Sequence, residues 1–421
     1  MARVSSRVAL IWLLVAAGSA AACGGASPTP TTPAAKPSAA ATVEAQPGVA
    51  QPMTGAGAVS YQQGLAAYMN GDLAGAKAAF QQAAKADPGA AQPHYSLGVV
   101  LERLEDPGAL GEYRQAHTIS PEFEPAIVAY ALLLGKRGNF TEAESFLQEK
   151  RGKMPKSAAV ISALAEVKSM NRDTSAAQQL AQEALKINSN YRPAMVTIAR
   201  DHYRNRRLDL SLYALQAILD GFGDENPPRD KDNPDAHFLR ALILKEEGRR
   251  AAAISELKQA VAFRPDLVEA KVELAAFLLE AGNANEAQPL LESAIRFSAN
   301  HVIAHLNLGD TYRLQGRTAD AKAQFEWVLA RDTALAQVHY DLALLYLFSP
   351  NLPGMDTKRQ TDEAIAEIQK YQQMRGKLSA GQSDDSDELL NRAKQKQADL
   401  TAQAAANEPA AAPAGKGDGG P

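Results

Sequence analysis

Small residues recur along this chain at a nearly constant interval, and this repeat restricts the fold more than any other feature of the sequence. Six of the eight intervals are 33 or 34 residues long, and the other two are 42 and 43 residues. A period of this length is typical of arrays in which every repeat is one supersecondary unit. The residues concerned are Ala76, Ala109, Ala143, Ala177, Ser211, Ala253, Ala287, Ala321 and Ala364.

A second set of small residues precedes the first by about twelve positions in most units. A large apolar residue follows the first set by four positions, for example Phe80 and Phe325, and glycines mark many of the intervening turns. We interpret each unit as two amphipathic helices joined by a short turn, with the small residues of both helices facing each other where the helices cross. The second set consists of Gly64, Gly98, Ala131, Ala165, Ala199, Ala241, Ala275, Gly309 and Ala343.

This pattern resembles the tetratricopeptide repeat (TPR) family, whose repeats carry a small residue at position 8, Ala at position 20, and an aromatic residue or Leu at position 24. Repeat eight matches it well, with Gly309, Ala321 and Phe325 in register. The resemblance covers residues 57–371 and implies an all-α TPR solenoid, a right-handed superhelix of about nine helix-turn-helix repeats. Because no repeat can bury its apolar face alone, stacked neighbours are expected to share one core.

Two insertions interrupt the array, at residues 221–233 and 349–359. Since repeat five also has Ser211 in place of Ala, we expect superhelical packing to break at the first insertion. Residues 372–404 place acidic before basic side chains, which complements a helix dipole and predicts a C-terminal capping helix. The Ala-, Pro- and Gly-rich residues 405–421 are predicted to form a disordered tail.

The N-terminus combines two basic residues with the apolar run 8–17, which is too short to span a bilayer but suits a signal peptide. The box Ala20-Ala21-Ala22-Cys23 follows and contains the single cysteine of the chain. Residues 1–22 therefore resemble a bacterial lipoprotein signal. The resemblance implies cleavage before Cys23 and lipidation of that residue, which is followed by Gly24, as in lipoproteins of the outer membrane. An ordinary secretory signal with an incidental Cys23 is the alternative.

Residues 23–56 contain many Pro, Ala and Thr residues and almost no large apolar side chains. Such a segment cannot offset the entropy lost on folding. We predict a disordered tether that holds the folded body away from the membrane, facing the periplasm.

Nothing in the sequence indicates an enzyme. The net charge of −4 leaves no electrostatic footprint for nucleic acid, and no motif for catalysis, a cofactor, a metal or a small-molecule substrate was found. Four histidines share repeat position 4 and are interpreted as packing residues with a polar handle, with metal binding or pH sensing as the alternative. They are His94, His237, His305 and His339.

In TPR folds the first helix of each repeat faces the ligand, so the resemblance implies a partner-binding groove. The implied residues include many Tyr and Arg side chains, which are enriched in binding hot spots. The alternative is that several of them only pack against the next repeat. They are Tyr61, Tyr68, Tyr95, Arg103, Lys136, Arg200, Tyr203, Arg204, Phe238, Lys245, Arg313 and Tyr340.

Taken together, these features predict an outer-membrane-anchored scaffold that binds envelope proteins, an outer-membrane β-barrel among the candidates. The layout of lipobox, tether and long TPR array resembles the TPR lipoprotein of the myxobacterial adventurous gliding-motility machinery. Two alternatives remain open at this point. One is a pilotin-like lipoprotein for assembly of the type IV pilus secretin, and the other is a periplasmic chaperone or adaptor for outer-membrane biogenesis.

Overall fold

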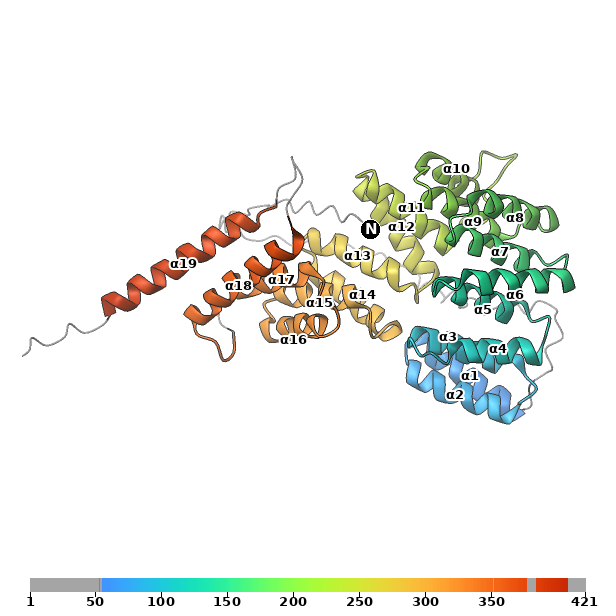
Figure 1. Cartoon of the computed structure of the whole chain (residues 1–421), viewed down its shortest axis with the longest axis horizontal. Coiled ribbons are helices and arrows are strands. Elements are labelled where there is room, and N and C mark those ends of the chain that lie inside the picture. Colours follow the sequence, from blue (N-terminus) through green and yellow to red (C-terminus); the bar gives the residue numbers. More distant parts are fainter. Residues whose placement is uncertain (1–52, 54, 351, 377–383, 408–421) are drawn as a thin grey trace, which may run out of the picture. The chain divides into compact units, whose positions relative to one another are not determined.

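The computed structural model describes residues 53, 55–350, 352–376 and 384–407, and these residues form nineteen α-helices and no strand (Figure 1). Cys23, the predicted signal 1–22 and most of the predicted tether 23–56 lie outside the described residues, as do residues 408–421 of the predicted tail. Helices α1 to α18 form nine consecutive hairpins, so the predicted all-α array is confirmed.

The first five hairpins pair α1 (Gly55–Met69) with α2 (Leu73–Ala86), α3 (Ala91–Arg103) with α4 (Ala109–Ile119), α5 (Glu124–Lys136) with α6 (Phe140–Lys153), α7 (Ala158–Met170) with α8 (Thr174–Ile187), and α9 (Arg192–Arg204) with α10 (Leu208–Leu219). The next four pair α11 (Pro234–Glu246) with α12 (Arg250–Phe263), α13 (Val268–Glu280) with α14 (Ala284–Phe297), α15 (Val302–Leu314) with α16 (Thr318–Leu329), and α17 (Ala336–Phe348) with α18 (Thr357–Arg375).

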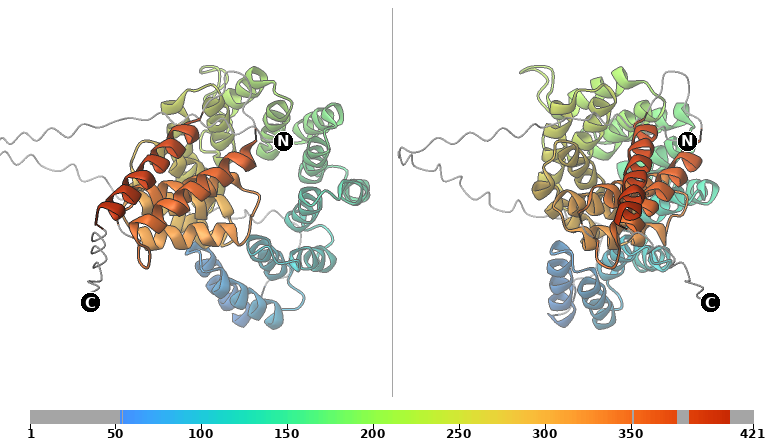
Figure 2. Two further views of the ribbon diagram at one scale, coloured as in Figure 1. Left: turned by 60° about the vertical axis from the view of Figure 1, so that its left-hand side comes forward. Right: turned by 90° about the vertical axis from the view of Figure 1, so that its left-hand side faces the viewer.

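The chain divides into two compact units. Both units are discontinuous in sequence. The larger unit contains the described residues up to Phe277 together with Pro289–His301. The smaller unit contains Leu278–Gln288 and the described residues from Val302 onward. The division therefore falls within the α13–α14 hairpin. In the larger unit, successive hairpins follow one another along an arc (Figure 2).

Each helix crossing depends on the sizes of two residues. A Cβ atom added to Gly309 on α15 would lie 2.4 Å from Cε1 of Phe325 on α16, and Gly64 and Gly98 face the rings of Phe80 and Tyr113 in the same way. The glycine thus lies under the aromatic ring, and the two sets of small residues do meet in hairpin five, where the Ser211 hydroxyl donates to the carbonyl of Ala199 at 2.8 Å. In the other six hairpins, Ala replaces this glycine, and Leu, Ile or Ala replaces the aromatic residue.

The turn inside each of the first eight hairpins has one residue with a positive φ angle. That residue ends the first helix. The amide of the following residue donates a hydrogen bond to the carbonyl five residues before it, as in Arg317 N to Tyr312 O at 2.8 Å. Three turns adopt this geometry without glycine, at a cost of roughly 1–2 kcal/mol each. The positive-φ residues are Gly71, Glu105, Gly138, Arg172, Arg206, Gly248, Gly282 and Gly316.

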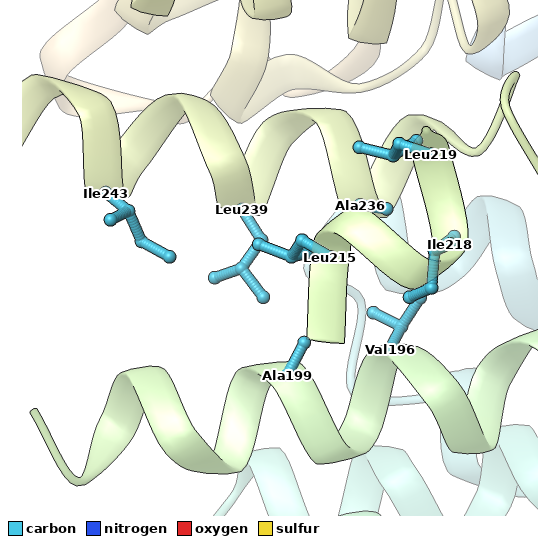
Figure 3. Close-up of a cluster of buried hydrophobic side chains, with 8 residues drawn as sticks. All are labelled: Val196, Ala199, Leu215, Ile218, Leu219, Ala236, Leu239 and Ile243. Carbon is cyan, nitrogen blue, oxygen red and sulfur yellow. The ribbon is translucent and has the colours of Figure 1, made fainter. Parts of the chain in front are cut away.

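Packing is continuous across the first insertion, contrary to the predicted break. Leu215 and Ile218 on α10 are fully buried between side chains of α9 and α11 (Figure 3). The end of the insertion contacts α10 again, where the amide of Asp230 donates to the carbonyl of Ile218 at 2.8 Å. Asn233 then caps α11 by accepting from the amide of Ala236 at 2.9 Å. The extra residues therefore bulge out of the array without separating its core.

Helix α19 (Ser386–Asn407) follows the ninth hairpin and packs against α18. Its Ala393 and Leu389 side chains are buried, and Lys396 Nζ donates to the carbonyl of Leu347 on α17 at 3.2 Å. This helix therefore covers the C-terminal end of the smaller unit. It runs to Asn407, past residue 404, where the predicted capping region ends.

The size match at the crossing predicts opposite effects of one substitution in two backgrounds. Gly309→Ala in the natural chain should lower the free energy of unfolding by about 1–2 kcal/mol through overpacking against Phe325. In a Phe325→Leu background, the same change should be neutral or stabilising by up to about 1 kcal/mol, because Ala favours a helix over Gly. Urea denaturation measures both. An equal effect in the two backgrounds would contradict the assigned contact.

Candidate protein-binding face

All twelve residues predicted to bind a partner lie on odd-numbered helices, the first helix of each hairpin. Odd-numbered helices contact one another in succession, with α5 against α7, α7 against α9 and α9 against α11 in the larger unit, and α15 against α17 in the smaller unit. Side chains one repeat apart therefore meet. We call the surface that they form the first-helix face.

Cations and tyrosines of this face contact carboxylates of a neighbouring repeat. The contacts are Lys136 Nζ to Glu102 Oε1 at 2.7 Å, the Tyr203 hydroxyl to Glu246 Oε1 at 2.8 Å, and Lys245 Nζ to Glu273. Burial and the bond to Glu246 raise the pKa of Tyr203 to about 12, so this hydroxyl stays a donor at neutral pH. The contacts tie α3 to α5, α9 to α11, and α11 to α13.

The most buried of these carboxylates is Glu166 on α7. It receives Arg204 Nη2 at 2.8 Å and Arg200 Nη1 at 3.1 Å, and the Thr197 hydroxyl donates to it at 2.9 Å. Burial alone would raise the pKa of Glu166, but the two guanidinium groups and the hydrogen bonds lower it below its usual value. Glu166 is therefore ionised and joins α7 to α9.

The smaller unit has its own polar cluster on this face. Arg313 Nη2 lies 2.9 Å from Asp310 Oδ1 on α15, and the Tyr340 hydroxyl of α17 donates to Asp385, just before α19, at 2.7 Å. Asp341 lies next to Tyr340 and is 2% exposed. Burial and then the charge of Asp310 raise the pKa of Asp341 well above its usual range, while Arg313 opposes the shift.

The remaining predicted residues of the face are aromatic. Tyr61 packs against Phe80 with ring centroids 5.5 Å apart, and Tyr95 packs in the same way against Tyr113 at 5.9 Å. Burial raises the pKa of Tyr95 to about 12. Phe238 on α11 is half-buried. Tyr61 also contacts the Ser96 hydroxyl at 3.1 Å, and Tyr95 meets Phe123 edge-on at 5.7 Å. These two tyrosines therefore pack within their own hairpin and against the next one, whereas Phe238 leaves part of its apolar surface accessible.

Two predicted residues bind a segment more than 160 positions away within the larger unit. The Tyr68 hydroxyl donates to Asp266 Oδ2 at 3.0 Å, and Arg103 Nη2 lies 3.1 Å from the same oxygen. The ring of Tyr68 also meets Phe297 edge-on at 5.9 Å. Burial and Asp266 raise the pKa of Tyr68 to about 12. We call this contact the Asp266 clasp, and it joins α1 and α3 to the start of the α13–α14 hairpin.

The acidic residues that pair with this face were not among the twelve residues predicted from the sequence. A signal for two of them was available, since Glu102 precedes Lys136 by 34 residues and Glu166 precedes Arg200 by 34 residues, one repeat in each case. Opposite charges one period apart on first helices predict such pairs. No comparable signal identifies Asp266, which lies in a turn.

Each position-4 histidine has a polar partner on the second helix of its own hairpin, which agrees with a packing residue that keeps a polar contact. Nδ1 lies 2.7 Å from Glu112 for His94, 2.7 Å from Glu256 for His237, 2.7 Å from Gln324 for His305, and 2.5 Å from Glu367 for His339. Within the described residues there is no group of three or more His, Cys, Asp or Glu side chains that could hold a metal ion. The same residues contain no helix long and apolar enough to cross a membrane.

Models of the tetratricopeptide repeat match residues 61–121, 196–268 and 266–334. The Cut9–Hcn1 hetero-tetramer of the APC/C has a similar fold, with a TM-score of 0.50 and 13% identity over 80% of this chain and 76% of that chain. PilF of Pseudomonas aeruginosa (TM-score 0.34, 22% identity, 52% and 97% covered) and the type IV pilus biogenesis factor PilW (0.37, 21%, 51% and 91%) are more distant in structure. The matched segments are therefore tetratricopeptide repeats, and the described array has the fold of a TPR solenoid, which supports a role as a scaffold for protein–protein interaction.

Neutralising the buried carboxylate should weaken the α7–α9 contact. Glu166→Gln is expected to lower the free energy of unfolding by about 2 kcal/mol, because a charged hydrogen-bonded partner is lost. The pKa of Glu166 is lowered on folding, so its contribution is present above about pH 4.5 and is lost as the pH falls through the folded-state pKa. The stability gap between the two proteins should therefore narrow below pH 4.5.

Glu149→Gln is the matched control, because Glu149 forms an exposed pair with Lys153 four residues away. Exposed pairs of this kind contribute little, so its unfolding curve should overlay that of the natural chain. Equal curves for Glu166→Gln and Glu149→Gln would refute the structural role of Glu166.

Proposed function

We propose that this chain is a scaffold held by a lipid on Cys23 at the periplasmic side of the outer membrane, where it organises a multiprotein machine of the cell envelope. One observation carries the proposal. A lipobox-like sequence, Ala20-Ala21-Ala22-Cys23, precedes a Pro- and Ala-rich segment and then a body built of protein-binding repeats. Attachment leaves the first-helix face available to soluble or membrane-bound partners.

The charges of the first-helix face define the kind of partner that suits it. Lys136, Arg204 and Lys245 already contact carboxylates within the chain. An acidic peptide would have to compete with these internal pairs, and separating the buried Arg204–Glu166 pair costs free energy. A helical or extended segment with apolar side chains avoids this cost, because it can cover Phe238 without displacing a charge. We infer that partners bind chiefly through apolar contacts.

The machine that fits this layout best is a gliding-motility complex. The order of lipobox, tether and long TPR array resembles the TPR lipoprotein of the adventurous gliding machinery. In such a machine, a tethered solenoid would link outer-membrane components to periplasmic ones. Secretin assembly and general chaperoning are the competing outcomes of the partner experiment below.

The anchor is tested by Cys23→Ser. Without the thiol no lipid can be attached, so the protein should move from the membrane fraction to the soluble periplasmic fraction on cell fractionation. The far-UV circular dichroism of the purified variant should match that of the natural chain, because Cys23 precedes the first helix. Retention of Cys23→Ser in the membrane fraction would show that the anchor is wrong.

The partner is tested by a crosslinked pull-down of the tagged chain from detergent-solubilised envelopes, read by mass spectrometry. A short stoichiometric set that contains an outer-membrane β-barrel and motility proteins is expected. Phe238→Ala should reduce recovery of the main partner about tenfold, as for a hot-spot aromatic residue. Ile187→Ser, which changes an exposed residue at the end of a second helix, should leave recovery unchanged.

Other outcomes would reassign the function. A set dominated by a pilus secretin would favour the pilotin-like alternative. Many unrelated proteins at low occupancy would favour a chaperone. Equal recovery with Phe238→Ala and Ile187→Ser would mean that partners bind away from the first-helix face.

A further inference from the structure

Helix α19 occupies the place that the first helix of a tenth hairpin would take. Along the array, the first helix of a hairpin packs against the second helix of the preceding one, as α3 does on α2 and α17 does on α16. Helix α19 packs against α18 in the same manner (Figure 2). The end of the array therefore presents a helix-binding surface, and in this chain α19 fills it.

The start of α19 is acidic, and side chains of the ninth hairpin bind it. Asp384 accepts a hydrogen bond from the Tyr371 hydroxyl at 3.1 Å and lies 2.9 Å from Arg375 Nε. Asp385 accepts from the Tyr340 hydroxyl at 2.7 Å. Burial and the charge of Asp384 raise the pKa of Tyr371 to about 12. Burial and the bond to Asp385 raise the pKa of Tyr340 well above its usual range, so both hydroxyls stay donors at neutral pH.

One face of α19 continues this contact. Ser386 is fully buried, and its hydroxyl oxygen accepts from Gln372 Nε2 at 3.1 Å and from Arg375 Nη2 at 3.0 Å. Leu389 and Ala393 are also buried and follow Ser386 by three and seven residues. This spacing places the three side chains on the same side of a helix. The occupant is thus recognised by an acidic start followed by a narrow apolar stripe.

The fit of α19 to this surface is incomplete. Phe348 at the end of α17 is still 47% exposed, although the guanidinium of Arg392 lies 4.9 Å from the centre of its ring. Among the described residues of α19, only Leu389 and Ala393 are buried apolar side chains, and residues 401–406 are all exposed. Polar contacts at one end therefore hold most of the helix in place. The surface that α19 contacts includes Tyr340, Phe348, Tyr371, Gln372 and Arg375, and we call it the end site.

The carboxylates bound here differ in origin from those of the larger unit. Glu102 on α3 and Glu166 on α7 belong to helices of the repeats, so they cannot leave without disrupting a hairpin. Asp384 and Asp385 belong to a segment that follows the nine hairpins. They can therefore be replaced together, as a set, while the hairpins stay folded.

We propose that the end site is a docking site for an amphipathic helix with an acidic start, that α19 is its resident occupant, and that a helix of this kind from a protein partner displaces α19. A second copy is a poor competitor, because its α19 is identical and lacks the high local concentration of a helix in the same chain. A partner helix must make better contacts, and a large apolar residue at the place of Arg392 would do so by covering Phe348. The proposal adds to the scaffold role and does not depend on the lipid anchor.

Binding of a labelled peptide to the full chain tests the end site. The probe is a fluorescein-labelled peptide with the sequence of residues 384–407, measured by fluorescence anisotropy. A release variant, Asp384→Ala with Leu389→Asp, removes one contact of α19 and puts a charge into its buried face, but leaves the end site unchanged. This variant should bind the peptide at least about tenfold more tightly than the natural chain, in which α19 competes. Asp399→Ala is the matched control, because Asp399 is an exposed carboxylate on the same helix, and it should bind as weakly as the natural chain.

Two further changes test the assigned contacts. Arg375→Gln, added to the release variant, should weaken peptide binding at least about tenfold, because the bonds to Asp384 and Ser386 are lost. A peptide with Arg392→Leu should bind the release variant about threefold more tightly, because it covers apolar surface of Phe348. No binding by a release variant whose circular dichroism shows folded hairpins, or equal binding by the natural chain and the release variant, would overturn the proposal.

Hydrogen exchange of the natural chain tests displacement without any substitution. Amides of residues 389–397 should exchange together and at least about 100-fold faster than buried amides of α17, because α19 leaves while the array stays folded. An excess of the Arg392→Leu peptide should speed their exchange further. Equal protection of α19 and α17 would show that α19 leaves only when the unit unfolds, which contradicts the proposal. Dimers formed by exchange of α19 between copies, seen by sedimentation, would make a second copy the occupant and would contradict the partner.

Discussion

The close crossing of two helices in every hairpin is the constraint on which the rest of this structure depends. Two residue combinations allow this close approach. One is glycine under an aromatic ring, and the other is alanine combined with leucine or isoleucine. Eight of the nine hairpins use one of them. Because each hairpin has such a close crossing, successive hairpins within one unit can stack on one another. That regular stacking brings side chains one period apart into contact and produces the polar contacts of the first-helix face.

Those polar contacts give the first-helix face a structural role in addition to its proposed binding role. Residues predicted for partner binding, such as Lys136 and Arg200, also bind carboxylates of the preceding repeat. Under the proposed function, a partner would bind a face whose charges are already paired within the chain. Recognition would then depend on shape and apolar contact more than on charge. It also couples binding to stability, since any partner that separates Glu166 from its guanidinium groups loosens the packing of α7 on α9.

Features set within one repeat could be predicted from the sequence. Features that depend on the summed geometry of several repeats could not. The period predicted the hairpins, and the histidines at position 4 were correctly interpreted as packing residues because their partners lie in the same hairpin. The Asp266 clasp depends on the summed rotation of several hairpins, and small deviations at each step decide whether Asp266 meets Tyr68. No pattern within one period encodes that distance. The contact of Gly309 with Phe325 follows from the same period, since the large residue four positions after Ala321 lies next to the crossing.

The insertion after α10 shows how a repeat array acquires a new surface without losing its core. A break in packing was expected because Ser211 replaces alanine, yet its hydroxyl donates to the carbonyl of Ala199 at 2.8 Å and so stays satisfied while buried. With the crossing intact, Leu215 and Ile218 still pack against α9 and α11, and the extra residues are directed outward. Contacts in a solenoid are confined to neighbouring repeats. An added loop therefore changes only the surface beside it, which is where Phe222 meets Tyr213.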